Sequence, residues 1–265
     1  MTAQQRWCWR RPVTTWLPPV TFFGLLLATW HLAVSWSGVP PYLLPGPLRV
    51  ATAIGANFGK LVDAVLLTAT GALAGFLLSC VVGIATGLRF SQSRVIERSL
   101  YPYAIFLQTV PIVAIAPLII LWIGYGLQGV VAVAFIISLF PMVANTTTGT
   151  TSLRPDLVDL FRLNNASRWQ MLVRLRLPHA VPNILTGARV SSGLSVIGAI
   201  VGEFFAGYGT EDFGLGYLII QANGQAKTDL LFAAILFSTL LGLAIFTVVG
   251  VLNTILLRRW GDSPR

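Results

Sequence analysis

The chain has 265 residues, of which 55% are hydrophobic and 10% are charged, and its formal net charge is +9 at pH 7. An ordinary soluble domain carries about 25% charged residues, so this composition excludes a soluble globular protein and indicates an integral membrane protein. The basic residues fall between long apolar stretches, and this distribution argues against nucleic-acid binding.

Six stretches are apolar enough to cross a bilayer as helices, a crossing that takes about 20 residues. We expect them at residues 16–36, 62–88, 100–122, 127–148, 184–206 and 230–257. The sequence therefore predicts an all-α integral membrane protein with six transmembrane helices. Residues 16–257 would form one domain between cytoplasmic tails at 1–15 and 258–265. The first stretch lacks a small-residue cleavage site, so we expect a retained helix and not a signal peptide.

The basic residues predict the orientation of the chain. Fifteen arginines lie before the first span, after the last, and in the segments between spans two and three and around the connection of spans four and five. The opposite side holds only Arg49, Lys60 and Lys227. Because basic residues of short loops stay in the cytoplasm, we expect both termini to be cytoplasmic.

The second span carries a small residue at every fourth position, after a Pro-rich outer loop at 38–47 and a short amphipathic helix expected at 48–61. A stripe of small residues lets another helix approach closely. The stripe could pack within the subunit, which we favour, or against a second subunit. Its members are Gly71, Gly75, Ser79, Gly83 and Gly87.

The third and fourth spans contain prolines and amides at membrane depth. Prolines kink helices, and polar groups inside a membrane need partners or water. We therefore expect Gln108, Pro111 and Asn145 to line a translocation pathway. The alternative is a pair of kinked helices whose polar groups are satisfied by their neighbours.

The fifth span repeats the small-residue spacing, and the next step of four reaches an acid. Ionisable groups inside spans usually face the protein interior or a water-filled cavity. Ser195 and Glu203 are therefore also candidates for the pathway. Glu203 lies 16 residues beyond Gly187, about 24 Å along the axis, so it could instead reach the outer interface. Both interpretations stay open at this point.

The segment at about 152–180 is a candidate docking surface, because five arginines alternate there with apolar residues. Pro155 followed by two aspartates favours a helix start. An Asn-Asn pair interrupts that helix, Asn165 can cap a second helix, and Pro178 would end it. These features predict a short helix-turn-helix on the cytoplasmic side.

This segment resembles the EAA loop in permease subunits of binding-protein-dependent ABC importers. The family pattern is Glu-Ala-Ala, a Gly four residues after the second Ala, and a later Ile-x-Leu-Pro. Asp159 stands at the Glu, Leu160 and Phe161 at the alanines, Asn165 at the Gly, and Leu175-Arg176-Leu177-Pro178 at the last element. Leu160, Phe161 and Asn165 replace the two alanines and the glycine of the family pattern, so the detailed packing of this loop need not follow the family.

The surrounding sequence is closer to the nitrate/sulfonate/taurine branch of these permeases. The most similar residues lie at 166–170 (Ala-Ser-Arg-Trp-Gln), 198–205 and 214–219, and the resemblance spans roughly 61–257. It is especially near members assigned to import of pyrimidine thiamin precursors or riboflavin. The transported solute would accordingly be such a compound, or a nitrate-, sulfonate- or taurine-like anion.

The resemblance implies a MetI-like fold with a cytoplasmic coupling helix, in the bacterial inner membrane. It further implies a homodimer with two cytoplasmic ABC ATPase subunits and an extracytoplasmic substrate-binding protein. The residues expected to couple to the ATPase are Asp159, Leu160, Phe161, Asn165, Ala166, Arg168 and Pro178.

The sequence holds no P-loop and no recognisable catalytic motif. We therefore expect a transport subunit that is not an enzyme, with no metal or cofactor of its own and with ATP bound by its partners. A secondary transporter or channel is the alternative, but neither an inverted repeat nor paired midplane acids are visible. A membrane enzyme or a purely structural scaffold fits less well.

Overall fold

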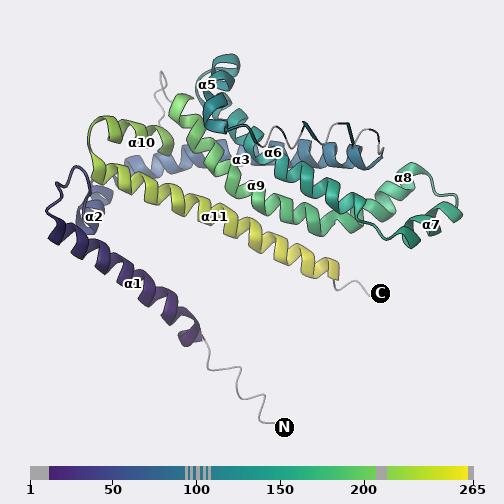
Figure 1. The fold of residues 1–265 in the computed structure, drawn as a ribbon, viewed down its shortest axis with the longest axis horizontal. Helices are drawn as coiled ribbons and strands as arrows, with labels where there is room; N and C mark the ends of the chain where they lie inside the picture. The colour runs from purple at the N-terminus through teal and green to yellow at the C-terminus, as the bar shows by residue number, and fades with distance from the viewer. Residues whose placement is uncertain are drawn as a thin grey trace, which may run out of the picture. The chain divides into compact units, whose positions relative to one another are not determined.

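The computed structural model describes residues 12–92, 95, 98–99, 102–103, 106, 109–206 and 214–261 (Figure 1). The elements in the described part of the chain are helices. They are α1 Pro12–Ser37, α2 Pro47–Ala56, α3 Phe58–Gln92, α5 Ile112–Ile123, α6 Leu127–Thr151, α7 Pro155–Leu163, α8 Arg168–Met171, the π-helix η2 Leu172–Arg176, α9 Leu177–Ala206, α10 Leu215–Gly224 and α11 Thr228–Gly261.

Five helical stretches of the described residues are long and apolar enough to cross a membrane. They are Pro18–Ser37, Phe58–Gln92, Leu127–Thr151, Arg168–Ala206 and Thr228–Arg258. They correspond to five of the six expected spans. The third expected span is represented by α5, which has 12 residues and starts directly after Pro111. Half of the residues at 100–111, in the first part of that expected span, lie outside the described residues, so the count of six spans is not fully confirmed.

The chain forms two compact units, each described here separately. Unit 1 comprises Met1–Phe58 and Ala222–Ala233, and unit 2 comprises Gly59–Gln221 and Ala234–Arg265. In unit 1 the ring of Trp30 stacks on Phe232 at 5.8 Å between centroids. The helix expected at 48–61 ends earlier, at Ala56, because the Asn57 amide donates to the carbonyl of Ala53 and terminates α2.

In unit 2, α6 packs against the small-residue stripe of α3. A Cβ added to Gly71 would lie 2.8 Å from Val130, and one added to Gly75 would lie 2.6 Å from Ala134. Gly83 and Gly87 approach α6 in the same way further along, and Ser79 between them is fully buried. The stripe therefore serves close packing within a single chain.

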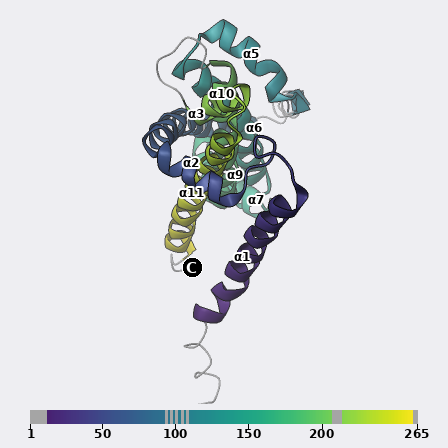
Figure 2. The same cartoon turned by 90° about the vertical axis from the view of Figure 1, so that its left-hand side faces the viewer.

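The other side of α6 packs against α9, and α11 contacts α9 in turn (Figure 2). The Ser191 hydroxyl donates to the carbonyl of Ser138 at 2.7 Å, so the two backbones lie close together. On α11, the Asn253 amide donates to the carbonyl of Leu185 at 2.6 Å. These polar contacts and small residues replace the hydrophobic driving force that water provides in soluble proteins.

Filling the α3 stripe should loosen this packing. We expect Gly75→Leu to destabilise the chain by about 1–3 kcal/mol, the cost of overpacking a close contact. The measurement is the midpoint of thermal unfolding in detergent. Gly59→Leu on the same helix is the matched control, because a Cβ there meets no atom within 4 Å. Equal midpoints for the two variants would contradict the packing role.

Candidate functional site

The segment between α6 and α8 folds into the expected helix-turn-helix. Pro155 occupies the first turn of α7, and Arg154 pairs with Asp156 at 2.7 Å. The hydrogen bond from Arg154 lowers the pKa of the Asp156 carboxyl below its ordinary value. The carboxylate therefore stays ionised at the positive end of the helix dipole.

The turn itself differs from the expectation at Asn165. Asn165 closes the first helix and does not cap the second, because its backbone has φ 52°. Its N–H donates to the carbonyl of Arg162, and the N–H of Ala166 donates to that of Phe161, which is a Schellman motif. Ser167 caps α8 instead, in a capping box with Gln170. The left-handed backbone also explains why the family pattern has a glycine at this position.

Pro178 was expected to end the second helix, and this expectation is wrong. α8, η2 and α9 form one continuous helix from Arg168 to Ala206, 39 residues long. The N–H of Leu177 donates to the carbonyl of Leu172, five residues back, which widens the helix by one π turn. The wider turn before Pro178 makes room for a ring that would otherwise clash with the preceding carbonyl.

The helix-turn-helix exposes an apolar surface bordered by charge. Leu160, Leu163 and Trp169 are 53%, 81% and 71% exposed, and no residue of α7 or α8 is buried. We call these three residues, with the exposed Asp159 and Arg168, the docking surface. Large apolar groups gathered among charges typically mark an interaction site.

The remaining residues of the expected coupling set have different positions. Asn165 is exposed at the turn, and Phe161 and Ala166 are half-buried beneath it. Pro178 is exposed but lies ten residues beyond Arg168, about 15 Å along the helix. The docking surface is therefore centred on the turn, away from Pro178.

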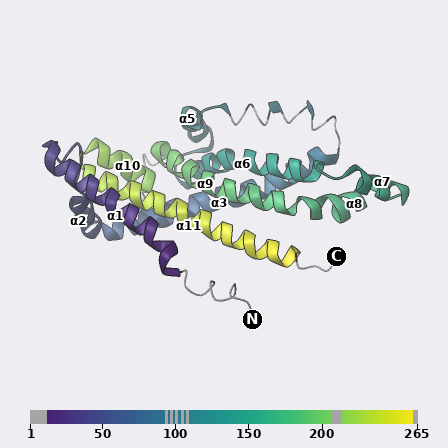
Figure 3. The same ribbon diagram turned by 60° about the horizontal axis from the view of Figure 1, so that its bottom comes forward.

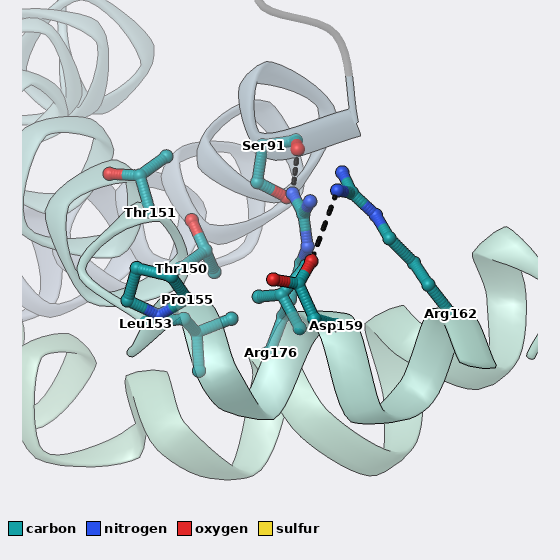
Figure 4. Close-up of a pocket in the computed structure, with 9 residues that line it drawn as sticks. Ser91, Thr150, Thr151, Leu153, Pro155, Asp159, Arg162 and Arg176 are labelled. Carbon is teal, nitrogen blue, oxygen red and sulfur yellow. Dashed lines mark hydrogen bonds and ion pairs between the residues drawn. The ribbon is translucent and has the colours of Figure 1, made fainter. Parts of the chain in front are cut away.

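A pocket of about 390 Å³ lies beside the docking surface (Figure 4). The ends of α3 and α6 meet α7 and η2 there, and the Arg176 guanidinium donates to the carbonyl of Ser91. Asp159 and Arg162 pair at 3.5 Å on its α7 side. Sequence reasoning missed the Arg176–Ser91 contact, because its partners are 85 residues apart and no local pattern links them.

The residues expected along the pathway do not converge in the described chain. Gln108 lies outside the described residues, and Pro111 is exposed at the start of α5. The Asn145 amide donates to the carbonyl of Pro141 at 2.9 Å, within its own helix. Ser195 is fully buried and donates to the carbonyl of Ser192. Asn145 and Ser195 thus form hydrogen bonds within their own helices.

Glu203 joins three segments at the other end of α9. Its side chain is buried, and its Oε2 accepts hydrogen bonds from the Thr68 hydroxyl at 3.0 Å and the Gly216 N–H at 2.7 Å. The Leu215 N–H donates to the same Thr68 hydroxyl at 2.9 Å. A Cβ on Gly214 or Gly216 would collide with the Glu203 side chain. The two glycines are the sequence signal that could have revealed this close approach.

Residues 75–262 match the family model described as "Binding-protein-dependent transport system inner membrane component". The chain belongs to this family. It is a permease subunit of an ABC importer.

Curated relatives cover nearly the whole chain. The permease is 37% identical to the riboflavin transport system permease protein RibX of Chloroflexus aurantiacus, over 92% of the chain and 90% of the relative. It is 34% identical to the formylaminopyrimidine transport permease protein ThiX of Halalkalibacterium halodurans, over 91% and 95%.

The fold is shared with a solved transporter. An inward-facing structure of the MetNI methionine ABC transporter matches the permease with a TM-score of 0.58 over 73% of this chain and 96% of that one. The sequence identity is only 16%, so the match concerns the fold alone. The expected MetI-like fold and the family resemblance are both confirmed.

Proposed function

We propose that this permease forms a homodimer that carries a small nitrogen-containing ring compound across the inner membrane, with both termini in the cytoplasm. Two cytoplasmic ATPase subunits would supply the energy, and an extracytoplasmic binding protein would deliver the solute. The choice of solute class rests on the names of the two relatives above, riboflavin and formylaminopyrimidine.

The docking surface is the observation that carries the coupling role. An isolated transport subunit has no reason to expose Leu163 and Trp169 beside Arg168 at the end of its longest helix. An ATPase subunit that covered these side chains would remove apolar area from water, worth about 25 cal/mol per Å². The charged rim would then fix its orientation.

The continuous helix from Arg168 to Ala206 gives the docking surface a direct route into the membrane. α8 is followed by η2 and α9 without a break, so a displacement at the turn need not cross a flexible linker. Closure of the ATPase dimer on ATP would move the turn, and α9 would carry that movement along the α3–α6–α9 layer. The pathway would open alternately to either side of the membrane.

Purification and crosslinking test this proposal. We expect the purified chain alone to show no ATP hydrolysis, and a cysteine at position 166 to crosslink to a co-expressed ATPase subunit from its operon. A cysteine at Gly59, an open position on α3 at the far end from the turn, is the control and should give no crosslink. Hydrolysis by the single chain, or equal crosslinking from both positions, would contradict the assignment.

Uptake of tritiated riboflavin and of formylaminopyrimidine by proteoliposomes tests the solute class. The vesicles contain the assembled transporter, internal ATP and the binding protein encoded beside it. We expect ATP-dependent uptake of one of the two compounds. Uptake of nitrate or an alkyl sulfonate in their place would assign the permease to the anion-importing group.

A further inference from the structure

We infer that the helix Arg168–Ala206 is tied to α3 at both of its ends, and that Glu203 is the positioning residue that passes its movement to the first turn of α10. We call Glu203, Thr68 and the backbone of Leu215 and Gly216 the clasp. This inference rests on the proposed coupling role of α8. It names the first turn of α10 as the segment that the movement of α9 reaches.

The first tie lies at the docking end. Arg176 of η2 donates to the carbonyl of Ser91 in the last turn of α3. Carbonyl groups in the last turn of a helix lack partners within the helix, and a cation is favoured there by the helix dipole. Arg176 therefore connects the π turn beside the docking surface to the end of α3 (Figure 4).

The second tie is the clasp, 27 residues further along the same helix, about 40 Å away. Glu203 accepts from Thr68 of α3 and from Gly216 of α10, and Thr68 accepts from Leu215. The Glu203 side chain is 3% exposed, so water does not compete for these bonds. Figure 3 shows α7 and α8 at one end of α9 and α10 at the opposite end.

The chemistry of the clasp suits the start of a helix. The first N–H groups of α10 have no partner within that helix, and an acidic group near them is favoured by the dipole. Two of these groups are satisfied from outside α10, one by Glu203 and one by Thr68. α10 therefore begins where α3 and α9 hold its backbone, and a shift of α9 must carry this turn with it or break the bonds.

Glycine makes this contact possible. A Cβ on Gly216 would stand 2.8 Å from the Cβ of Glu203, which is closer than side chains normally approach. Glycines also let α9 approach α6 closely, because Gly198 and Gly202 of α9 lie directly against α6. Packed backbones with no long side chains between them shift together.

Thr68→Val tests the clasp with little change of shape, because only the hydroxyl is lost. Thr70→Val is the matched control: its hydroxyl is exposed and bonds only to Leu67 of its own helix. In the purified chain we expect amide hydrogen exchange at 214–218 to be at least about tenfold faster in Thr68→Val than in wild type, the effect of losing a buried hydrogen bond. Thr70→Val should leave it unchanged. Wild-type exchange in Thr68→Val would overturn the clasp.

The assembled complex tests whether movement passes through the clasp. Hydrogen exchange is compared with and without ATP and vanadate, which requires no knowledge of the solute. In wild type we expect exchange to change at both 168–176 and 214–218. In Glu203→Ala, which removes the acceptor of the Gly216 N–H, the change at 168–176 and ATP hydrolysis should persist while the change at 214–218 is lost, and Glu203→Gln should restore it. A retained response at 214–218 in Glu203→Ala would refute transmission.

These outcomes separate the clasp from the function on which it rests. If ATP and vanadate leave 168–176 of wild type unchanged, the proposed coupling role of α8 is wrong. Transmission from α8 to α10 is then overturned with it. The exchange measurement on the purified chain decides independently whether the Thr68 hydroxyl holds the first turn of α10.

Discussion

Arg168→Glu is expected to abolish solute uptake by the assembled transporter while the chain still inserts into the membrane. Arg168 is exposed at the first position of α8, beside the apolar Trp169. Reversing a charge at a covered interface costs about 2–5 kcal/mol, so uptake should fall by more than tenfold. The measurements are uptake in proteoliposomes and the amount of ATPase subunit that copurifies.

The matched control for this prediction is Arg89→Glu. Arg89 is exposed in the last turn of α3, and its reversal changes the charge of the same side of the membrane by the same amount. Any effect on insertion through the positive-inside rule should therefore be shared by both variants. Loss of uptake in both, or in neither, would remove Arg168 from the docking surface.

Substitution of Glu203 is expected to have the second large effect. In Glu203→Ala the Gly216 N–H loses its acceptor inside the protein, at about 1–3 kcal/mol, while the Thr68 hydroxyl keeps the carbonyl of Ala64 at 2.9 Å. We expect a lower midpoint of thermal unfolding and a loss of ATP-driven uptake. Glu203→Gln keeps an oxygen that can accept both bonds, so it should retain more uptake than Glu203→Ala and assemble normally.

The comparison of the two Glu203 variants separates two roles. If Glu203 acts by holding backbone and hydroxyl groups, Gln should replace it in part, because neutral amide oxygen accepts the same bonds. If its charge faces the solute in the pathway, Gln and Ala should lose uptake equally while Gln keeps wild-type stability. That second pattern would return Glu203 to the pathway residues and remove it from the clasp.

Much of the fold could be predicted from periodicity and composition. The apolar stretches predicted five long helices that the structure contains, because a helix that crosses a bilayer must satisfy its backbone internally and carry apolar side chains throughout. The small-residue stripe of α3 predicted a close helix partner. Neither pattern could name the partner, since any smooth helix face fits such a stripe.

The helix-turn-helix shows where local rules compete. Proline at 155 correctly indicated the start of α7. At 164–167 (Asn-Asn-Ala-Ser) we predicted Asn165 as the cap of the second helix, but the structure uses Ser167, because Asn165 already occupies the left-handed position that ends α7. Pro178 usually ends a helix, but a π turn placed before it relieves the steric conflict. The helix preferences of single residues do not predict a π turn at this position.

The sequence by itself determined the class of the protein, its long helices and the cytoplasmic-type segment that resembles an ABC permease loop. These features depend on neighbours in the chain, through apolar runs, helix caps and charge clusters. Only the tertiary structure decided the roles of Glu203, Thr68 and Arg176. Glu203 lies 135 residues from Thr68, and Arg176 lies 85 from Ser91. Helix packing alone brings such groups within hydrogen-bond distance, so no local pattern records them.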